Sequence, residues 1–143
     1  NQEDQNRLEE LKTLAKNLEI SDNVQFYPNL PFEEKNNFLK LAKFGVHGMI
    51  DAPFGIVLVA FQAAGVICSA HNSAGPKYDI IQENNEFGFL WKDEEELTNF
   101  FIRAAGMSKR DYNSKQAKSR KASQRFSDEN FMEQFIETLH KIL

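Results

Sequence analysis

The hydrophobic pattern of the chain predicts helices that alternate with short strands. Leucines and an alanine recur at helical spacing between Leu8 and Leu18, which predicts an amphipathic helix over about residues 4–19. Short apolar runs predict strands over 24–27, 44–49, 66–70 and 86–91. Helical spacing predicts further helices over 32–43, 54–64, 93–106 and 108–124, and a last one from Ser127. This alternation is typical of α/β proteins with a parallel, doubly wound sheet.

The later helices carry expectations about burial. The helix over 108–124 is basic and is expected to be a solvated face rather than a contact with anionic lipid. In the other helices apolar residues are expected to face the core: Phe38, Leu39 and Ala42; Leu97, Phe100, Phe101 and Ala104; Phe131, Phe135, Ile136, Leu139 and Leu143.

The stretch 51–81 is the most informative part of the sequence. Residues 54–64 contain no charge and one polar side chain, Gln62, so this helix is expected to be buried on all sides. Gly55 would let the helix N-terminus come close to a ligand, and Gly65 suits a left-handed C-terminal stop.

A second loop follows the strand at 66–70. Residues 71–76 are small or polar, and Pro76 is well placed to begin a helix. The two helix N-termini would lie at the carboxyl edge of one sheet, where parallel α/β folds bind their ligands. Unpaired N–H groups and helix dipoles point there, so the sequence predicts a site for a phosphate or a sugar.

These motifs resemble the donor-sugar motif of the retaining GT-B glycosyltransferases, which reads E-P-F-G-x-x-x-x-E-A-M-A-x-G followed by a G-G-P loop. Within that group the sequence is similar to the eukaryotic α-1,2-mannosyltransferases that extend dolichol-linked oligosaccharides. The similarity lies in Phe54-Gly55-Ile56, Ala63-Ala64-Gly65, Ala70-His71-Asn72-Ser73, Gly75-Pro76-Lys77 and Asp79-Ile80-Ile81, and continues through Gly88-Phe89-Leu90 and Arg125-Phe126-Ser127-Asp128.

The resemblance implies a Rossmann-like parallel sheet flanked by helices, the C-terminal half of a GT-B fold. Residues 1–143 would form a single partial donor-binding domain, without its first strand and without the N-terminal acceptor domain. The donor would be a nucleotide-sugar, GDP-mannose, and the acceptor a lipid-linked oligosaccharide on the cytosolic face of the endoplasmic reticulum. Neither a metal nor another cofactor would be required. The implied donor-binding residues are Phe54, Gly55, Ile56, His71, Asn72, Ser73, Gly75, Pro76 and Lys77, and no catalytic residue is assigned.

The sequence departs from this family at three positions. The family has two glutamates, associated with the donor sugar and with the nucleotide ribose, where this chain has Ala52 and Ala60. Position 52 is expected to lie in an open loop. Ala74 replaces the first glycine of the G-G-P loop, which would be crowded if the backbone there has a positive φ. The alternative to an enzyme is therefore a degenerate, noncatalytic GT-B module with a structural or regulatory role, or a chain in which the alanines were introduced deliberately.

Four polar residues in or beside the two loops have candidate roles. His71 could contact a sugar or could hold its loop, and Lys77 could face a phosphate. Asp79 is expected to stabilise the start of its helix. Asp51, next to the lost first glutamate, could partly replace it.

Composition limits the remaining functions. In 143 residues the hydrophobic fraction is 41%, with 13 phenylalanines, which is typical of a packed domain rather than a disordered chain. The net charge of −4 offers no basic surface for nucleic acid. Cys68 lies in a predicted buried strand and is expected to be a structural thiol. No apolar run reaches the roughly 20 residues that span a bilayer, and no His, Cys and carboxylate set has metal-ligand spacing.

Overall fold

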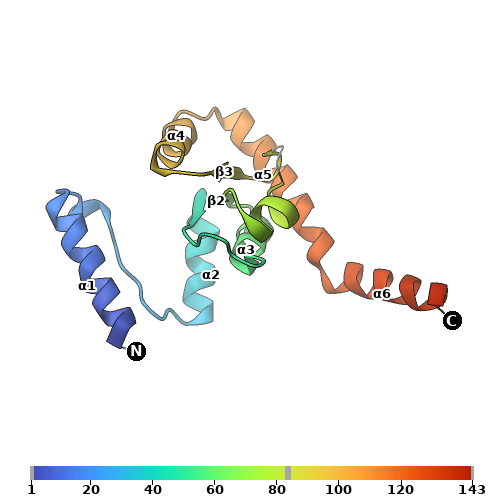
Figure 1. Cartoon of the computed structure of the whole chain (residues 1–143). Helices are drawn as coiled ribbons and strands as arrows, with labels where there is room; N and C mark the ends of the chain where they lie inside the picture. Colours follow the sequence, from blue (N-terminus) through green and yellow to red (C-terminus); the bar gives the residue numbers. More distant parts are fainter. Residues whose placement is uncertain (1, 83–84, 143) are drawn as a thin grey trace. The chain divides into compact units, whose positions relative to one another are not determined.

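The computed structural model describes residues 2–82 and 85–142 (Figure 1). These residues divide into two compact units, one ending at Lys35 and one beginning at Asn36. Whether residues 1–143 act as a single partial domain stays a prediction.

The first unit contains helix α1 (Gln2–Asn17), a 3-10 turn η1 (Ser21–Asn23) and the start of helix α2 (Phe32–Leu41). The prediction of a helix near residues 4–19 is confirmed, but only Ala15 is buried on its apolar stripe. The prediction of a strand over 24–27 is wrong. A strand needs a neighbouring strand for its backbone hydrogen bonds, and the described residues pair none with this segment.

The second unit is built on a parallel sheet, which confirms the predicted α/β class. Among the described residues the sheet has three strands in the order β1 (Phe44–His47), β2 (Ile67–His71) and β3 (Phe89–Trp91). In the register, Gly45 pairs with Cys68, and Ala70 pairs with Leu90. All three carboxyl ends therefore lie at one edge of the sheet.

Helix α3 (Ile56–Ala64) connects β1 to β2 and lies between two left-handed glycines; the left-handed stop predicted at Gly65 is confirmed. Gly55 has φ 98° and Gly65 has φ 78°. Leu58 and Gln62 are fully buried, but Ile56 is 74% exposed, so the expectation of burial on all sides is wrong. The helix packs on the sheet and on α5, and Ile56 and Val57 lie on its exposed side.

The core lies between α3, the sheet and the π-helical turn η2 (Pro76–Ile80). Leu58, Cys68, Ala70, Ile80 and Ile81 form its fully buried cluster. The Cys68 thiol is buried and donates to the carbonyl of Phe87 at 3.6 Å, which confirms a structural role.

Helix α4 (Glu94–Ala105) and helix α3 lie on opposite faces of the sheet (Figure 1). Helix α4 packs on the sheet with Phe100, whose ring contacts the rings of Phe44 and Phe89. The Asp93 side chain caps this helix by accepting from the N–H of Glu96, as predicted. Phe100 and Ala104 are buried, but Phe101 is 52% exposed, because it points away from the sheet-facing stripe. Phe38 of α2 is also expected to face the core, but it is 43% exposed.

Helix α5 (Lys109–Ser123) carries the predicted solvated basic face, since Lys109, Arg110, Lys118, Arg120 and Lys121 are exposed, but its other side packs on α3. Ser119 and Ala122 are buried, and its polar side chains bond the end of α3: Gln116 donates to the carbonyl of Gly65, and Arg120 donates to that of Ala64, both at 3.0 Å. Long basic side chains can pack along their stems while their charged ends satisfy carbonyls.

Helix α6 (Asp128–Ile142) follows a 3-10 turn, η3 (Gln124–Phe126), and begins at the predicted cap, since Ser127 accepts from the N–H of Asn130 at 3.2 Å. Its apolar stripe is not core: Phe131 is 64% exposed, and Phe135, Ile136 and Leu139 are also exposed. A stripe is buried only when another surface faces it, and the described residues provide none. Leu143, the last residue expected in this stripe, lies outside the described residues.

The burial of Cys68 predicts a pH dependence of stability. Desolvation raises the pKa of its thiol from 9.0 to about 12. In the unfolded chain the thiol ionises near pH 9, so stability is fully present below pH 9 and is lost as the pH rises toward 12. Between pH 8 and pH 10 the free energy of unfolding should fall by about 1.4 kcal/mol more in the parent than in Cys68→Ala. Urea titrations at the two pH values measure this difference, and equal losses in both proteins would contradict it.

Candidate functional site

Two loops meet at the carboxyl edge of the sheet, as the sequence predicts. The first loop (residues 48–55) follows β1, and the second loop (residues 72–75) follows β2. The N–H of Gly75 donates to the carbonyl of Ala52 at 3.1 Å, and the N–H of Asp51 donates to the Ser73 hydroxyl at 3.0 Å. The two loops are therefore joined directly.

Gly75 allows this contact because it has no side chain. A Cβ at position 75 would lie 2.5 Å from both the Cα and the carbonyl oxygen of Phe54, and 2.6 Å from the carbonyl oxygen of Pro53. These are backbone atoms and cannot swing aside. The backbone of Gly75 is right-handed, so the glycine serves close approach rather than an unusual conformation.

Ala74, beside it, does have an unusual conformation. Its φ is 42°, in the left-handed region that the family's glycine would adopt without cost. The crowding expected at a positive φ therefore applies, and an alanine there costs roughly 1–2 kcal/mol relative to its preferred conformation.

His71 holds the second loop through the same serine. Its Nδ1 lies 2.8 Å from the Ser73 hydroxyl, and its ring meets the Trp91 ring edge to face at 5.2 Å. Since the hydroxyl also accepts from Asp51, the chain of contacts runs from β3 through His71 and Ser73 to the first loop. These contacts supply the loop-holding role that the sequence left open, and contact with a sugar stays a prediction.

The other predicted donor-binding residues lie around this junction. An added Cβ on Gly55 would stand 3.6 Å from the Pro76 ring, so the start of α3 and the start of η2 are neighbours. Phe54 is partly exposed and packs against Phe126. Ile56 does not join the group, because its side chain is turned to solvent.

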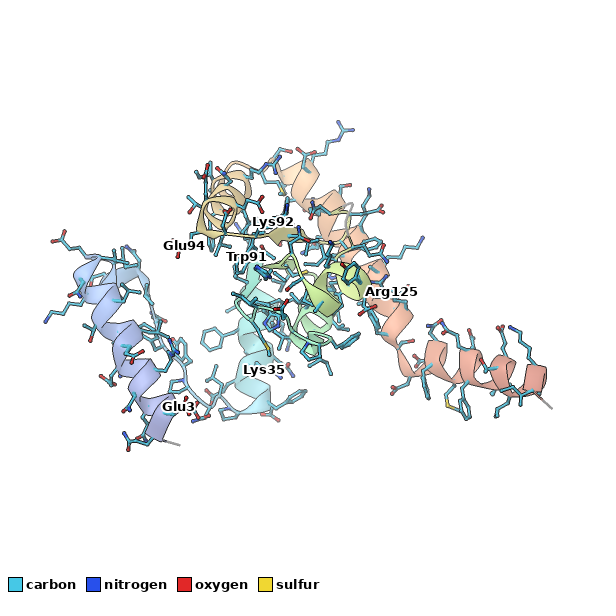
Figure 2. The ribbon with its side chains drawn as sticks, in the orientation of Figure 1. Glu3, Lys35, Trp91, Lys92, Glu94 and Arg125 are labelled. Carbon is cyan, nitrogen blue, oxygen red and sulfur yellow. The ribbon has the colours of Figure 1, made fainter. Side chains whose placement is uncertain are left out.

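Asn72 and Lys77 line a cavity of about 560 Å³ beside the second loop. The lining also includes Lys92, which directly follows β3 and is labelled in Figure 2, and Glu96 and Arg103 of α4. The Glu96 carboxylate accepts from the backbone N–H of Lys92 at 2.7 Å. With three cationic side chains and one carboxylate, the lining favours an anion.

Sequence reasoning missed Lys92 and Arg103. Lys92 could have been found, because it directly follows a predicted strand and ligands bind at the carboxyl ends of parallel strands. Arg103 lies in the last turn of α4, and no local pattern indicates that it reaches this cavity.

The two alanines at the family's glutamate positions have different surroundings. Ala52 is only 2% exposed and its carbonyl holds Gly75, so the expectation of an open loop at position 52 is wrong. The second loop covers it. Ala60 is half-buried on α3, with the exposed Val57 and Ala63 near it in sequence.

Within residues 2–82 and 85–142, no group of three or more His, Cys, Asp or Glu side chains could hold a metal ion. Of the helices described, none is long and apolar enough to cross a bilayer.

Comparison with known proteins identifies the family. The family model described as "Glycosyl transferases group 1" matches residues 4–120. Three relatives are named "GDP-Man:Man(3)GlcNAc(2)-PP-Dol alpha-1,2-mannosyltransferase". The mouse protein is 35% identical over 145 residues, covering 100% of this chain and 30% of the relative. The human protein is 35% identical over 144 residues (99% and 29%), and the Dictyostelium discoideum protein is 36% identical over 142 residues (99% and 28%).

The chain thus spans less than a third of the length of these curated relatives. The resemblance noted from the motifs at the two loops is confirmed over nearly the whole chain. The chain belongs to the group 1 glycosyltransferase family.

Proposed function

We propose that this chain is the nucleotide-sugar-binding part of a GDP-mannose-dependent α-1,2-mannosyltransferase. The enzyme would extend a dolichol-linked oligosaccharide at the cytosolic face of the endoplasmic reticulum, in the assembly of the N-glycan precursor. The observation that carries the proposal is the direct contact of the two loops through Gly75. The names of the relatives support the choice of donor and acceptor.

In this proposal the protein acts on the donor mainly through electrostatics. The first N–H groups of α3, at Ile56 and Val57, would face the diphosphate, whose negative charge grows as the sugar leaves. The start of η2 offers no free N–H there, because Pro76 has none and the N–H of Lys77 donates to the carbonyl of Ser73 at 3.3 Å. Lys77, which begins η2 with Pro76, would add a positive charge beside it. We propose that the chain supplies no catalytic side chain and that the transfer needs neither a metal nor another cofactor.

The acceptor would be bound outside this chain. The lipid-linked oligosaccharide would approach the donor from an acceptor domain facing the carboxyl edge of the sheet. The first and second loops would then hold the reacting sugar in position, which is how binding energy is turned into rate.

One observation favours the second candidate function, a noncatalytic GT-B module. Ala52 stands where the family has the glutamate for the donor sugar, and it is buried under the second loop. The space that a carboxylate would need is filled, whereas the packing of α3 on the sheet is intact. A module retained for its structure would look like this.

Gly75→Ala tests the loop contact. The new Cβ would overlap the backbone of Phe54, so the loops must separate, and we expect a loss of about 1–3 kcal/mol in the free energy of unfolding. Gly48→Ala is the matched control, because a Cβ there meets nothing within 4 Å and should change stability by less than about 0.5 kcal/mol. Urea titration compares the two, and equal effects would contradict the geometry of the junction.

The chain should bind GDP or GDP-mannose weakly. Each missing glutamate would have made a charge-assisted hydrogen bond of about 1.5–3 kcal/mol, so losing both lowers the affinity for GDP-mannose about a hundredfold or more, and losing the ribose contact alone lowers the affinity for GDP about tenfold or more. Calorimetry with both ligands measures this, with Gly75→Ala as a variant that should bind neither. Low-micromolar affinity in the parent would show that other groups have taken over the lost contacts.

Restoring the glutamates separates the two candidate functions. Ala60→Glu should cost less than about 1 kcal/mol in stability, because position 60 is only half-buried beside the exposed Val57 and Ala63, and a glutamate there can keep its carboxylate in water. Ala52→Glu should cost several kcal/mol, because it buries a carboxylate under the second loop.

The affinity of Ala60→Glu for GDP then distinguishes the glycosyltransferase from the noncatalytic module. If the donor site has lost only side chains, Ala60→Glu should bind GDP about tenfold more tightly or better than the parent in the same calorimetric titration. A stable Ala60→Glu protein with unchanged GDP affinity would favour the noncatalytic module.

A further inference from the structure

The turn between α5 and α6 contacts the elements of both loops. We refer to residues 124–127, which include η3, as the buttress turn. The Nη2 atom of Arg125, which is labelled in Figure 2, donates two hydrogen bonds, to the carbonyl of Asp79 at 2.5 Å and to that of Ile80 at 2.7 Å. These carbonyls belong to the last residues of η2, whose first residue directly follows Gly75.

This contact suits the end of a helical turn. The last carbonyls of a helix lack partners in the next turn, and a positive charge there is favourable. Partial burial lowers the pKa of the Arg125 guanidinium, and the nearby Asp79 opposes that effect. An arginine stays charged in proteins at neutral pH, so it binds these carbonyls as a cation.

The neighbouring residue contacts the first loop. The Phe126 ring meets the Phe54 ring edge to face, with centroids 5.5 Å apart. The Arg125 guanidinium lies over the Phe126 ring at 4.6 Å, so the two side chains form one unit. Phe126 also packs against the buried core cluster. The unit therefore reaches from the end of η2 to Phe54 in the first loop.

The buttress turn is itself held in place. The Asn130 side chain donates to the carbonyl of Arg125 at 2.6 Å, and the N–H of Asn130 donates to the Ser127 hydroxyl. The start of α6 thus fixes the backbone from which both side chains project.

We propose that Arg125 and Phe126 are positioning residues that set the separation of the first and second loops, and thereby the affinity for the nucleotide-sugar. Arg125 holds η2 from its far end, and Phe126 holds Phe54. The loops meet where the N–H of Gly75 donates to the carbonyl of Ala52, and the buttress turn holds the two loops at the separation that this hydrogen bond needs. The link to affinity rests on the proposed function, whereas the control of loop separation does not.

The first test is amide hydrogen exchange in the parent and in Arg125→Ala. The reporter is the N–H of Gly75, which bonds the first loop, and the reference is the N–H of Ile67, which donates to the carbonyl of Lys43 at the opposite edge of the sheet. Arg125→Ala should speed exchange at Gly75 about tenfold or more while Ile67 changes much less. A merely structural residue would speed both amides equally, by global unfolding, and that result would overturn the proposal.

Two variants act as controls. Arg110→Ala removes an exposed arginine from α5 and should leave both exchange rates unchanged. Arg125→Lys keeps an ammonium that can donate to the same carbonyls, so it should restore most of the protection at Gly75. If Arg125→Ala does not fold, Arg125→Lys and Phe126→Leu carry the test, and Phe126→Leu should also speed exchange at Gly75 selectively.

The second test is a GDP titration to millimolar concentration, followed by the fluorescence of Trp91, the only tryptophan in the sequence, whose ring contacts His71. GDP affinity should fall about tenfold in Arg125→Ala and return toward that of the parent in Arg125→Lys. Unchanged affinity in Arg125→Ala would overturn the link to ligand binding. If the parent binds no GDP but Gly75 still exchanges faster in Arg125→Ala, the donor function fails and the positioning of the loops stands.

Discussion

The close approach of the Gly75 backbone to Pro53 and Phe54 is the constraint on which the candidate site depends. A distance of 2.5 Å from a would-be Cβ to backbone atoms leaves room for hydrogen only. Because of it, the loop after β1 and the loop after β2 form one surface, and the starts of α3 and η2 come together beside it. The rest of the second unit, from the parallel sheet to the buttress turn, supports this contact.

Much of this arrangement could be predicted from local sequence. Gly55 and Gly65 mark the two ends of α3, Asp93 marks the start of α4, and the apolar run before His71 marks the central strand. Each of these signals depends on a few neighbouring residues. Parallel strand order then places both loops at one edge without further information, and the family motifs indicate what such an edge binds.

The features that sequence could not provide all depend on distant partners. Ala52 is buried only because the second loop folds over it, and α5 is a packing helix only because its side chains find the carbonyls of Ala64 and Gly65. The apolar stripe of α6 shows the reverse case, since its spacing is that of a core helix but no described element faces it. Periodicity reports which face a helix would bury, and not whether a partner is present.

The central claim is that the two joined loops form a nucleotide-sugar site. It is tested most directly by mapping backbone amide shifts in the NMR spectrum of the labelled chain as GDP is added to millimolar concentration. If the loops form this site, the shifts should be concentrated at the amides of Gly55, Ile56, Gly75 and Lys77, with the amides of α6 unchanged. Shifts spread over α6, or no shifts at the two loops at saturating GDP, would contradict it.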